Sequence, residues 1–294
     1  MRFSPQNKLT LHTELNDYLN GKQIYPINIE ASITGICNAN CSWCFYSKDK
    51  RKESINTERL LNLFTELLEL GTKAVTFTGG GEPTCHKDFS IISKYPLLKK
   101  GLITNGLNKI DFDPINFEWI RVSKTNKDWN KENLQELRKT KTLGLCINYI
   151  GDINEIKNTL LLAEKLNLDY VQIRPALNTL GEVTNIEVPK INHPLLNISD
   201  YKFNEAKKKH SYTKCEGFHF VPFIWENGEV DVCAYHRDEP KYNLGNIYNS
   251  SFKDIVQRMP NSVDVATNCQ ICCKNHEINL LLSSLKKIED KDFV

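Results

Sequence analysis

The chain has 294 residues, of which 40% are hydrophobic and 25% are charged, and its formal net charge is +2. This composition supports a packed core, and its mixed charges exclude the strongly basic character of a dedicated nucleic-acid-binding protein. The sequence contains neither a signal peptide nor an apolar run long enough to span a membrane. We therefore expect a cytoplasmic protein, with no membrane partner, whose ten cysteines are ligands or catalysts rather than disulfides.

Strand-like and helix-like segments alternate along the first part of the chain. Helices are predicted at 57–70, where Leu60, Phe64 and Leu67 share one face before Gly71, and at 152–167, where Asp152 is a suitable N-cap. Alternation of this kind predicts βαβ units and a parallel sheet. The predicted strands are 26–32, 74–79, 101–104, 119–124, 145–150 and 169–175.

Several of these strands alternate apolar and polar residues, whereas parallel strands covered on both faces are usually apolar throughout. Ile120 and Val122, for example, interleave with Arg121 and Ser123. One face of the sheet then packs against helices and the other is polar. A barrel or half-barrel whose interior holds a charged ligand fits this pattern, and an open sheet with a solvated edge is the alternative.

The pattern changes after about residue 178, where a loop-like stretch indicates a linker. Asn227-Gly228 between two apolar runs predicts a hairpin, and 251–258 and 276–289 read as late helices. We therefore divide the chain into an N-terminal lead, a barrel, a linker and a C-terminal domain. Their predicted ranges are 1–25, 26–180, 181–210 and 211–294.

The segment ITGICNANCSWCF, residues 33–45, places Cys37, Cys41 and Cys44 in a C-x3-C-x2-C run. Iron–sulfur clusters and structural zinc ions are normally held by four protein ligands. A four-iron cluster on three cysteines leaves one iron open to bind a substrate or cofactor directly. Taken alone, the run is also compatible with a chance pattern or a partial zinc site.

Together with TGGGEPT at 78–84 and TNG at 104–106, the cysteine run resembles the radical SAM superfamily, and the resemblance covers about residues 26–290. It implies a 4Fe-4S cluster that binds S-adenosylmethionine and cleaves it reductively to a 5′-deoxyadenosyl radical. That radical abstracts hydrogen from the substrate. The implied cofactor-binding residues are Gly80, Gly81 and Glu82 for the methionine amine, Trp43 beside the adenine, Thr104 and Asn105, Ser123 for the ribose and Arg174 for the carboxylate.

The resemblance implies an α/β fold, with a partial (β/α)6 TIM-like barrel and a small C-terminal α+β domain. In that domain Cys215, Cys233, Cys269 and Cys272 follow the pattern C-x12-G-x4-C and then C-x2-C, with Cys273 as an alternative fourth ligand. The pattern resembles the twitch domain, a relative of SPASM, and implies an auxiliary 4Fe-4S cluster. On spacing alone, a zinc ion held by four thiolates is the alternative.

Three remaining cysteines are candidate hydrogen donors to a substrate radical: Cys85, Cys146 and Cys273. A thiol donor would give epimerisation, whereas electron transfer to the auxiliary cluster would give dehydrogenation. His86, His219, His236 and Tyr235 lie near the presumed site and are candidate substrate contacts.

The leading interpretation is a radical SAM oxidoreductase or isomerase that acts on a small molecule, sugar or nucleotide and takes electrons from a flavodoxin or ferredoxin. The lead is too short for the leader-recognition domain that peptide-modifying members often carry. An enzyme acting on a ribosomal peptide, an electron-transfer protein with two clusters, and a zinc-stabilised binding module are the alternatives.

Overall fold

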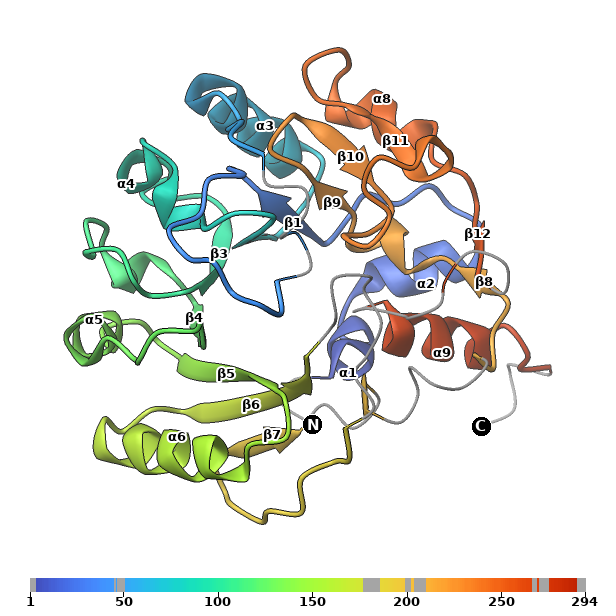
Figure 1. The fold of residues 1–294 in the computed structure, drawn as a ribbon. Helices are drawn as coiled ribbons and strands as arrows, with labels where there is room; N and C mark the ends of the chain where they lie inside the picture. The colour runs from blue at the N-terminus through green and yellow to red at the C-terminus, as the bar shows by residue number, and fades with distance from the viewer. Residues whose placement is uncertain are drawn as a thin grey trace.

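The computed structural model describes residues 4–44, 46, 51–176, 186–198, 202–203, 210–265, 269 and 275–289. The largest element in these ranges is a ten-stranded sheet with the order β11-β10-β9-β1-β2-β3-β4-β5-β6-β7. Strands β1 to β7 are parallel, so the predicted α/β class is confirmed. Figure 1 shows the sheet as an open arc, as expected for a partial barrel.

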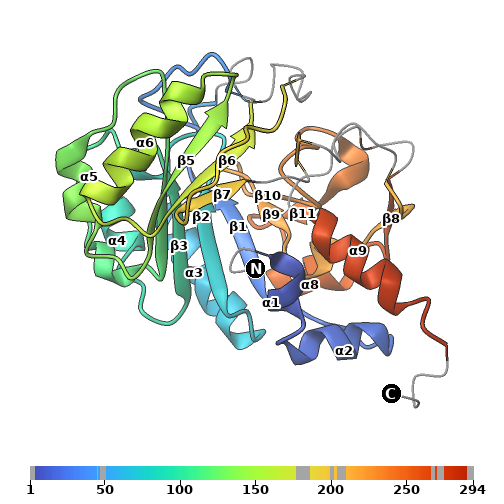
Figure 2. The ribbon, with the colours of Figure 1, turned by 90° about the horizontal axis from the view of Figure 1, so that it is seen from below.

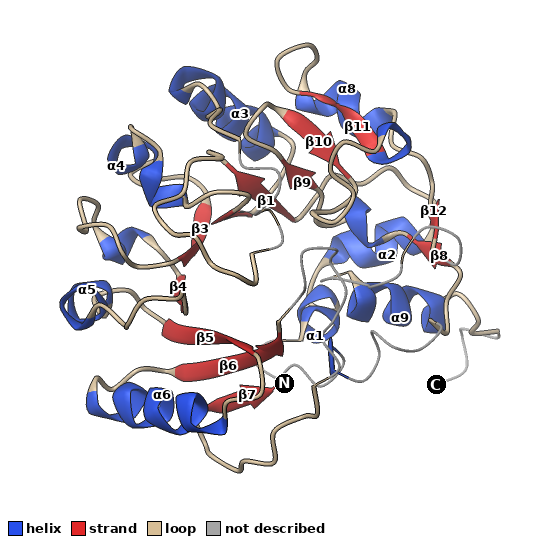
Figure 3. Ribbon diagram, viewed as in Figure 1, coloured by secondary structure: helices blue, strands red, loops and turns tan. Residues whose placement is uncertain are grey.

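The six predicted strands are all present, each within two residues of its predicted start. They are β1 (Asn28–Ser32), β2 (Ala74–Thr78), β3 (Lys99–Thr104), β4 (Trp119–Ser123), β5 (Leu143–Tyr149) and β6 (Tyr170–Pro175), followed by β7 (Leu196–Ile198). The helices that follow the strands lie along the outside of the arc (Figures 1 and 3). They are α3 (Thr57–Glu69), α4 (Phe89–Ile92), α5 (Lys131–Leu137) and α6 (Ile153–Lys165), and the short 3-10 helices η1 (Pro83–Cys85) and η2 (Pro114–Asn116) lie in the connections.

The two predicted helices begin and end where their capping residues indicate. Asn56 caps α3 by accepting a hydrogen bond from the Arg59 backbone N–H, and Gly71 follows α3 at a φ of +87°, which glycine adopts without strain. Asp152 caps α6 by accepting from the N–H groups of Asn154 and Glu155. Both helices bury one apolar face against the sheet.

The polar interior face of the predicted barrel is confirmed. On β4, Ile120 and Val122 are buried, and the side chains between them alternate to the other face. Arg121 from β4 reaches over β5 and donates to Gln172 Oε1 of β6 at 2.7 Å. Three strands therefore share one polar surface inside the arc.

The C-terminal part of the chain continues the same sheet. Strand β9 (Phe223–Ile224) pairs in parallel with β1, and β10 (Glu229–Asp231) and β11 (Asn243–Asn246) follow antiparallel. The predicted hairpin is confirmed between β9 and β10, with Gly228 at a φ of +84°. The predicted domain boundaries stay a prediction. The other elements here are β8 (Lys214–Cys215), η3 (Gly217–His219), η4 (Pro240–Tyr242), α8 (Phe252–Gln257), β12 (Val263–Asp264) and α9 (His276–Leu285).

The N-terminal lead contains two helices that the sequence analysis does not predict, α1 (Pro5–Leu9) and α2 (Thr13–Leu19). Each is too short to show a clear helical period. They pack beside α9, at the other end of the chain (Figure 2). Their shared apolar cluster consists of Leu9, Leu15, Ile24, Phe220, Ile278, Leu281 and Leu282. Within the described ranges, no helix is long and apolar enough to cross a membrane.

The packing of α2 predicts unequal costs for two leucine truncations. Leu15 is 8% exposed in the N-terminal cluster, whereas Leu11 is 83% exposed. We expect Leu15→Ala to lower the free energy of unfolding by roughly 2–4 kcal/mol, because it removes buried methyl groups and leaves a cavity. Leu11→Ala is the matched control and should change it by less than about 0.5 kcal/mol. Equal denaturant midpoints for the two variants would show that the cluster does not stabilise the fold.

Candidate functional site

The three cysteines of the first set lie in the loop that leaves the carboxyl end of β1. Backbone bonds fix the base of this loop, because Gly35 N–H donates to Glu53 and Ile55 N–H donates to Ile33. Within the loop, Cys44 N–H donates to the Cys41 carbonyl at 3.1 Å. Loops at the carboxyl ends of parallel strands are the usual place for active sites in barrel folds.

The surroundings of Cys37 affect the ionisation of its thiol in opposite directions. The Ala39 N–H lies 3.5 Å from the Cys37 sulfur, a contact that a metal-bound thiolate accepts. Partial burial, followed by the negative charges of Glu82, Cys85 and Cys44, raises the pKa of the Cys37 thiol. Cluster binding therefore has to release protons here.

In the described part of the chain, no three His, Cys, Asp or Glu side chains are gathered tightly enough to hold one metal ion. A single ion needs all of its ligands in contact with it, whereas each cysteine of a four-iron cluster binds a different iron.

The glycine turn after β2 lies directly on the start of the cysteine loop. A Cβ atom built on Gly81 would lie 2.4 Å from the carbonyl oxygen of Ile36 and 2.5 Å from that of Thr34, so no side chain fits. The next residue, Glu82, donates its N–H to the same Ile36 carbonyl at 2.8 Å. The two motifs identified in the sequence thus form one surface.

The carboxylate of Glu82 joins this turn to the end of β3. It accepts hydrogen bonds from the Thr104 hydroxyl at 2.6 Å, the Asn105 N–H at 2.7 Å and the Thr84 N–H and hydroxyl at 3.1 and 2.8 Å. Burial raises the pKa of Glu82, and these four donors act against that rise. The structure therefore brings together Gly81, Glu82, Thr104 and Asn105.

A chain of asparagine side chains, which the sequence analysis missed, surrounds this junction. Asn105 donates to Asn38 at 2.6 Å, and Asn38 donates to Asn108 at 2.7 Å. Asn108 in turn contacts the Thr84 carbonyl and the Cys85 sulfur, at 3.1 and 3.3 Å. Asn38 stands immediately after the first cysteine, and this position is the only signal in the sequence that pointed to it.

The remaining predicted cofactor-binding residues lie on β4, on β6 and in the cysteine loop. Ser123 ends β4, and its hydroxyl is buried without a hydrogen-bond partner among the described residues. Arg174 on β6 donates its Nε–H to Asn148 at 2.8 Å. Trp43 is half-buried in the cysteine loop. An orphaned buried hydroxyl of this kind fits a bound polar ligand, since buried polar groups are normally paired.

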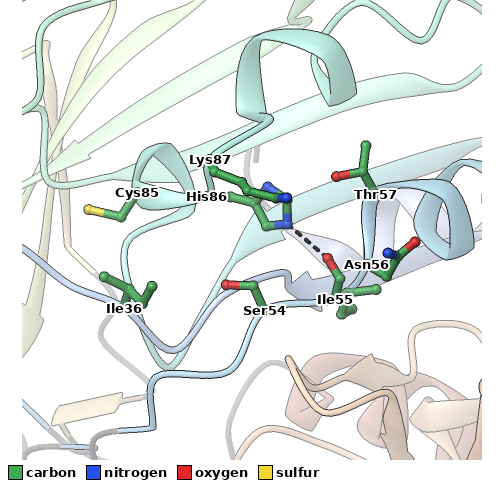
Figure 4. A pocket seen from close by; sticks show the side chains of 8 residues that line it. All are labelled: Ile36, Ser54, Ile55, Asn56, Thr57, Cys85, His86 and Lys87. Carbon is green, nitrogen blue, oxygen red and sulfur yellow. Dashed lines mark hydrogen bonds between the residues drawn. The ribbon is translucent and has the colours of Figure 1, made fainter.

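The candidate hydrogen donors differ in their surroundings. Cys146 on β5 is fully buried, whereas Cys85 is partly exposed, and burial raises the pKa of Cys85. Cys85 also lines a cavity of about 320 Å³, with Ile36, residues 54–57, His86 and Lys87 (Figure 4). His86 contacts the Ile55 carbonyl through Nε2 and accepts from Asp88 N–H, so it holds the wall of this cavity. Cys273 lies outside the described residues.

A buried ion pair beneath the glycine turn was also missed. Glu226 and Arg237 form this pair in the C-terminal hairpin region, and both side chains are buried. Ser32, the last residue of β1, donates to Glu226 Oε2 at 3.0 Å and accepts from the Gly80 N–H at 2.9 Å. A Cβ atom on Gly80 would lie 3.2 Å from Arg237 Nη1, so the ion pair supports the turn from below.

Of the second cysteine set, the structure describes three members. Cys215 is on β8, where its sulfur accepts from the Asn279 side chain at 3.2 Å. Cys233 follows β10 and is buried, and the Cys269 N–H donates to Val265 at 3.1 Å. Val265 itself donates to Thr213, two residues before Cys215, so Cys215 and Cys269 lie on neighbouring segments. Cys272 lies outside the described residues, as does Cys273.

Comparisons with known proteins concern the part of the chain that contains the first set of cysteines. Residues 31–169 match the family described as Radical SAM superfamily. GTP 3′,8-cyclase from Psychromonas ingrahamii is 33% identical over 109 residues, which cover 34% of this chain and 31% of that protein. The matched region thus spans about a third of this curated relative.

Solved structures resemble the fold over a longer stretch. Streptococcus suis SuiB bound to S-adenosylmethionine superposes with a TM-score of 0.63 at 13% identity, covering 85% of this chain and 70% of SuiB. Native anSMEcpe with bound AdoMet and Cp18Cys peptide superposes with a TM-score of 0.52 at 17% identity. The superposition covers 90% of this chain and 85% of anSMEcpe. At these identities the likeness establishes the fold, including its extension beyond residue 169.

The close contact at Gly81 predicts that an alanine lowers the stability of the fold more at position 81 than at position 80. We expect Gly81→Ala to lower the free energy of unfolding by about 1–3 kcal/mol, because its Cβ meets backbone atoms that cannot move aside. Gly80→Ala is the comparison, since its nearest neighbour is the end of the Arg237 side chain at 3.2 Å. Chemical denaturation of both variants measures these changes. A larger loss of unfolding free energy in Gly80→Ala than in Gly81→Ala would contradict the described packing.

The ion pair predicts a second stability difference. Glu226→Gln leaves the Arg237 guanidinium buried without its counter-ion, so we expect a loss of roughly 3–5 kcal/mol in the free energy of unfolding. The control is Glu136→Gln, which breaks the exposed Glu136–Lys139 pair and should cost less than about 1 kcal/mol. Similar losses in denaturation experiments would mean that the buried pair stabilises nothing.

Proposed function

Because residues 31–169 match the Radical SAM superfamily, we propose that this chain is an enzyme that cleaves S-adenosylmethionine and abstracts hydrogen from a small anionic substrate. One observation supports this most directly: the cysteine loop and the glycine turn meet at Gly81, without side chains between them. A nucleoside cofactor that binds the open iron of a cluster has to lie against that cluster, and the contact between the two loops supports this arrangement.

Each motif residue has a proposed role at this junction. Cys37, Cys41 and Cys44 would hold a 4Fe-4S cluster, and the backbone of Gly80 and Gly81 with Glu82 would receive the methionine amine. Thr104 and Asn105 donate hydrogen bonds that hold the Glu82 carboxylate in place and oppose the rise of its pKa on burial. Ser123 would bind the ribose, Arg174 the carboxylate, and Trp43 would lie beside the adenine. The chemistry supplied by cluster and S-adenosylmethionine together is one-electron cleavage of the sulfonium to a 5′-deoxyadenosyl radical.

The polar face inside the arc favours an anionic substrate. Arg121 and Arg174 both lie on this face, and each donates to a neutral amide, Gln172 and Asn148 respectively. Guanidinium groups recognise phosphate and carboxylate groups with paired hydrogen bonds. The partial similarity to GTP 3′,8-cyclase, whose name states a nucleotide substrate, supports a nucleotide over a neutral sugar or a peptide.

We further propose an auxiliary 4Fe-4S cluster on the second cysteine set, which would assist oxidation or substrate binding. A flavodoxin- or ferredoxin-type protein would supply the electron, and the reducing cytoplasm would keep the ligand thiols available. The spacing of these cysteines and their position on neighbouring C-terminal segments support this cluster.

Cofactor cleavage tests the proposal directly. We expect anaerobically reconstituted protein, reduced with dithionite, to convert S-adenosylmethionine to 5′-deoxyadenosine. Cys37→Ala/Cys41→Ala/Cys44→Ala should reduce this conversion at least 100-fold, because it removes the cluster ligands. Omitting dithionite is the matched control, since cleavage needs an electron. Chromatography of the nucleoside products gives the measurement, and unchanged conversion by the triple variant would refute the proposal.

The same protein can be used to distinguish between the candidate classes of substrate. Nucleoside triphosphates, neutral aminosugars and a peptide library are each incubated with the reduced enzyme and S-adenosylmethionine. Stimulation of 5′-deoxyadenosine formation by a nucleotide, and its loss in Arg121→Gln, would support the anionic substrate. Stimulation by neutral sugars or peptides alone would contradict it.

A further inference from the structure

The hydroxyl of Ser32 contacts the glycine turn at its first peptide groups. Ser32 is the last residue of β1 and pairs with Thr78, so the turn begins beside it. Its Oγ accepts a hydrogen bond from the Gly80 N–H at 2.9 Å. Cβ atoms built on Gly79 and Gly80 would lie 2.8 and 3.7 Å from this oxygen. The absence of side chains at these two positions therefore lets the turn lie directly against the hydroxyl.

A buried acidic group fixes the direction of the Ser32 hydroxyl. The hydroxyl has one proton, and its nearest acceptor is Glu226 Oε2 at 3.0 Å, closer than the Thr34 carbonyl at 3.4 Å. Ser32 is 0% exposed and Glu226 is 1% exposed, so bulk water does not compete for these bonds. Because the proton lies toward the carboxylate, a lone pair of Oγ faces the Gly80 N–H. Hydrogen bonds in series of this kind strengthen one another.

Glu226 is itself held from the side of the C-terminal hairpin. Its partner is the buried Arg237 guanidinium, whose central carbon lies 4.5 Å from the centroid of the Trp225 ring. Trp225 in turn donates its indole N–H to Asp231 at 2.6 Å. Ion pairs and cation–aromatic contacts between buried groups restrict each side chain to one position. A continuous series of buried contacts therefore runs from the hairpin to Gly80.

The bond to Gly80 also fixes the peptide group that joins Gly79 to Gly80. This group is planar and trans, so the Gly79 carbonyl points away from Ser32, opposite to the Gly80 N–H. Glycine has more backbone freedom than any other residue, so the turn depends on such a bond to stay in one conformation. A backbone that is already ordered loses less entropy when a ligand binds, and its affinity for that ligand is higher.

We propose that Ser32, oriented by Glu226, is a positioning residue for S-adenosylmethionine, because it holds the peptide groups of the glycine turn in place before the cofactor binds. This inference rests on the proposed function, in which Gly80 and Gly81 receive the methionine amine. Without the Ser32 hydroxyl, the Gly80 peptide has to be ordered when the cofactor binds. Ordering one backbone unit corresponds to a change of roughly tenfold in Kd.

The affinity of Ser32→Ala for the cofactor tests the inference. Anaerobically reconstituted protein is kept oxidised, so that no cleavage occurs, and is titrated with S-adenosylmethionine in a calorimeter. We expect Kd to rise about tenfold while the number of binding sites stays the same, because the turn is less ordered in a folded protein. A purely structural role would instead lower the number of sites through unfolding and leave Kd unchanged.

Ser93→Ala is the matched control for this titration. Ser93 is also 0% exposed, and its hydroxyl donates to the Ser90 carbonyl at 3.1 Å at the end of α4. It removes a buried, hydrogen-bonded hydroxyl without touching the glycine turn. Its Kd for S-adenosylmethionine should stay within about twofold of the wild-type value.

A second measurement needs neither a substitution nor the cofactor. In wild-type protein labelled with ¹⁵N-glycine, the Gly80 amide proton should exchange with solvent at least about 100-fold more slowly than that of Gly151, because its acceptor is buried. Gly151 is the reference because it lies in an exposed turn, where a built Cβ atom would have no neighbour within 4 Å. Nuclear magnetic resonance gives both rates. Equal rates for the two glycines would overturn the inference.

The two proposals fail separately. Wild-type protein that cleaves S-adenosylmethionine, together with an unchanged Kd in folded Ser32→Ala, would retain the proposed function and overturn this inference. Wild-type protein that binds S-adenosylmethionine more tightly than Ser32→Ala, but never forms 5′-deoxyadenosine, would do the reverse.

Discussion

The architecture of the candidate site depends on the close contact between two loops. Gly81 lies against the backbone of residues 34–36, and Glu82 then ties the same turn to the end of β3. A side chain at position 81 would push the glycine turn away from the cysteine loop. Because three consecutive strands meet through these contacts, the geometry of the junction is set by the sheet and does not depend on loop conformation alone.

The same constraint extends into the C-terminal part of the chain. Ser32 links Gly80 to the buried Glu226–Arg237 pair, and Arg237 lies a few residues after Cys233 in the chain. The glycine turn and the proposed C-terminal metal site are therefore joined by a short segment between Cys233 and Arg237. This arrangement makes the hairpin part of the site's support, although it is distant in sequence from both motifs.

Short-range patterns were sufficient to predict the strands, the two long helices and the hairpin. Each carries several periods of alternation or a distinct capping or turn residue, such as Asp152 or Gly228. The cysteine and glycine motifs likewise depend on local spacing. What the sequence could not provide is pairing between distant segments. Asn38, Asn108, Ser32 and Glu226 are ordinary polar residues until the fold brings them together, and α1 and α2 are stabilised by packing against α9.

The pairing of β9 with β1 has a consequence for biosynthesis. β1 leaves the ribosome before its outer neighbour β9, which is encoded about 190 residues later. Until that neighbour emerges, the nascent chain presents an unpaired strand edge, which is prone to associate with other chains. Closing so long a loop also slows folding. The C-terminal strands therefore act as a cover for the outer edge of β1.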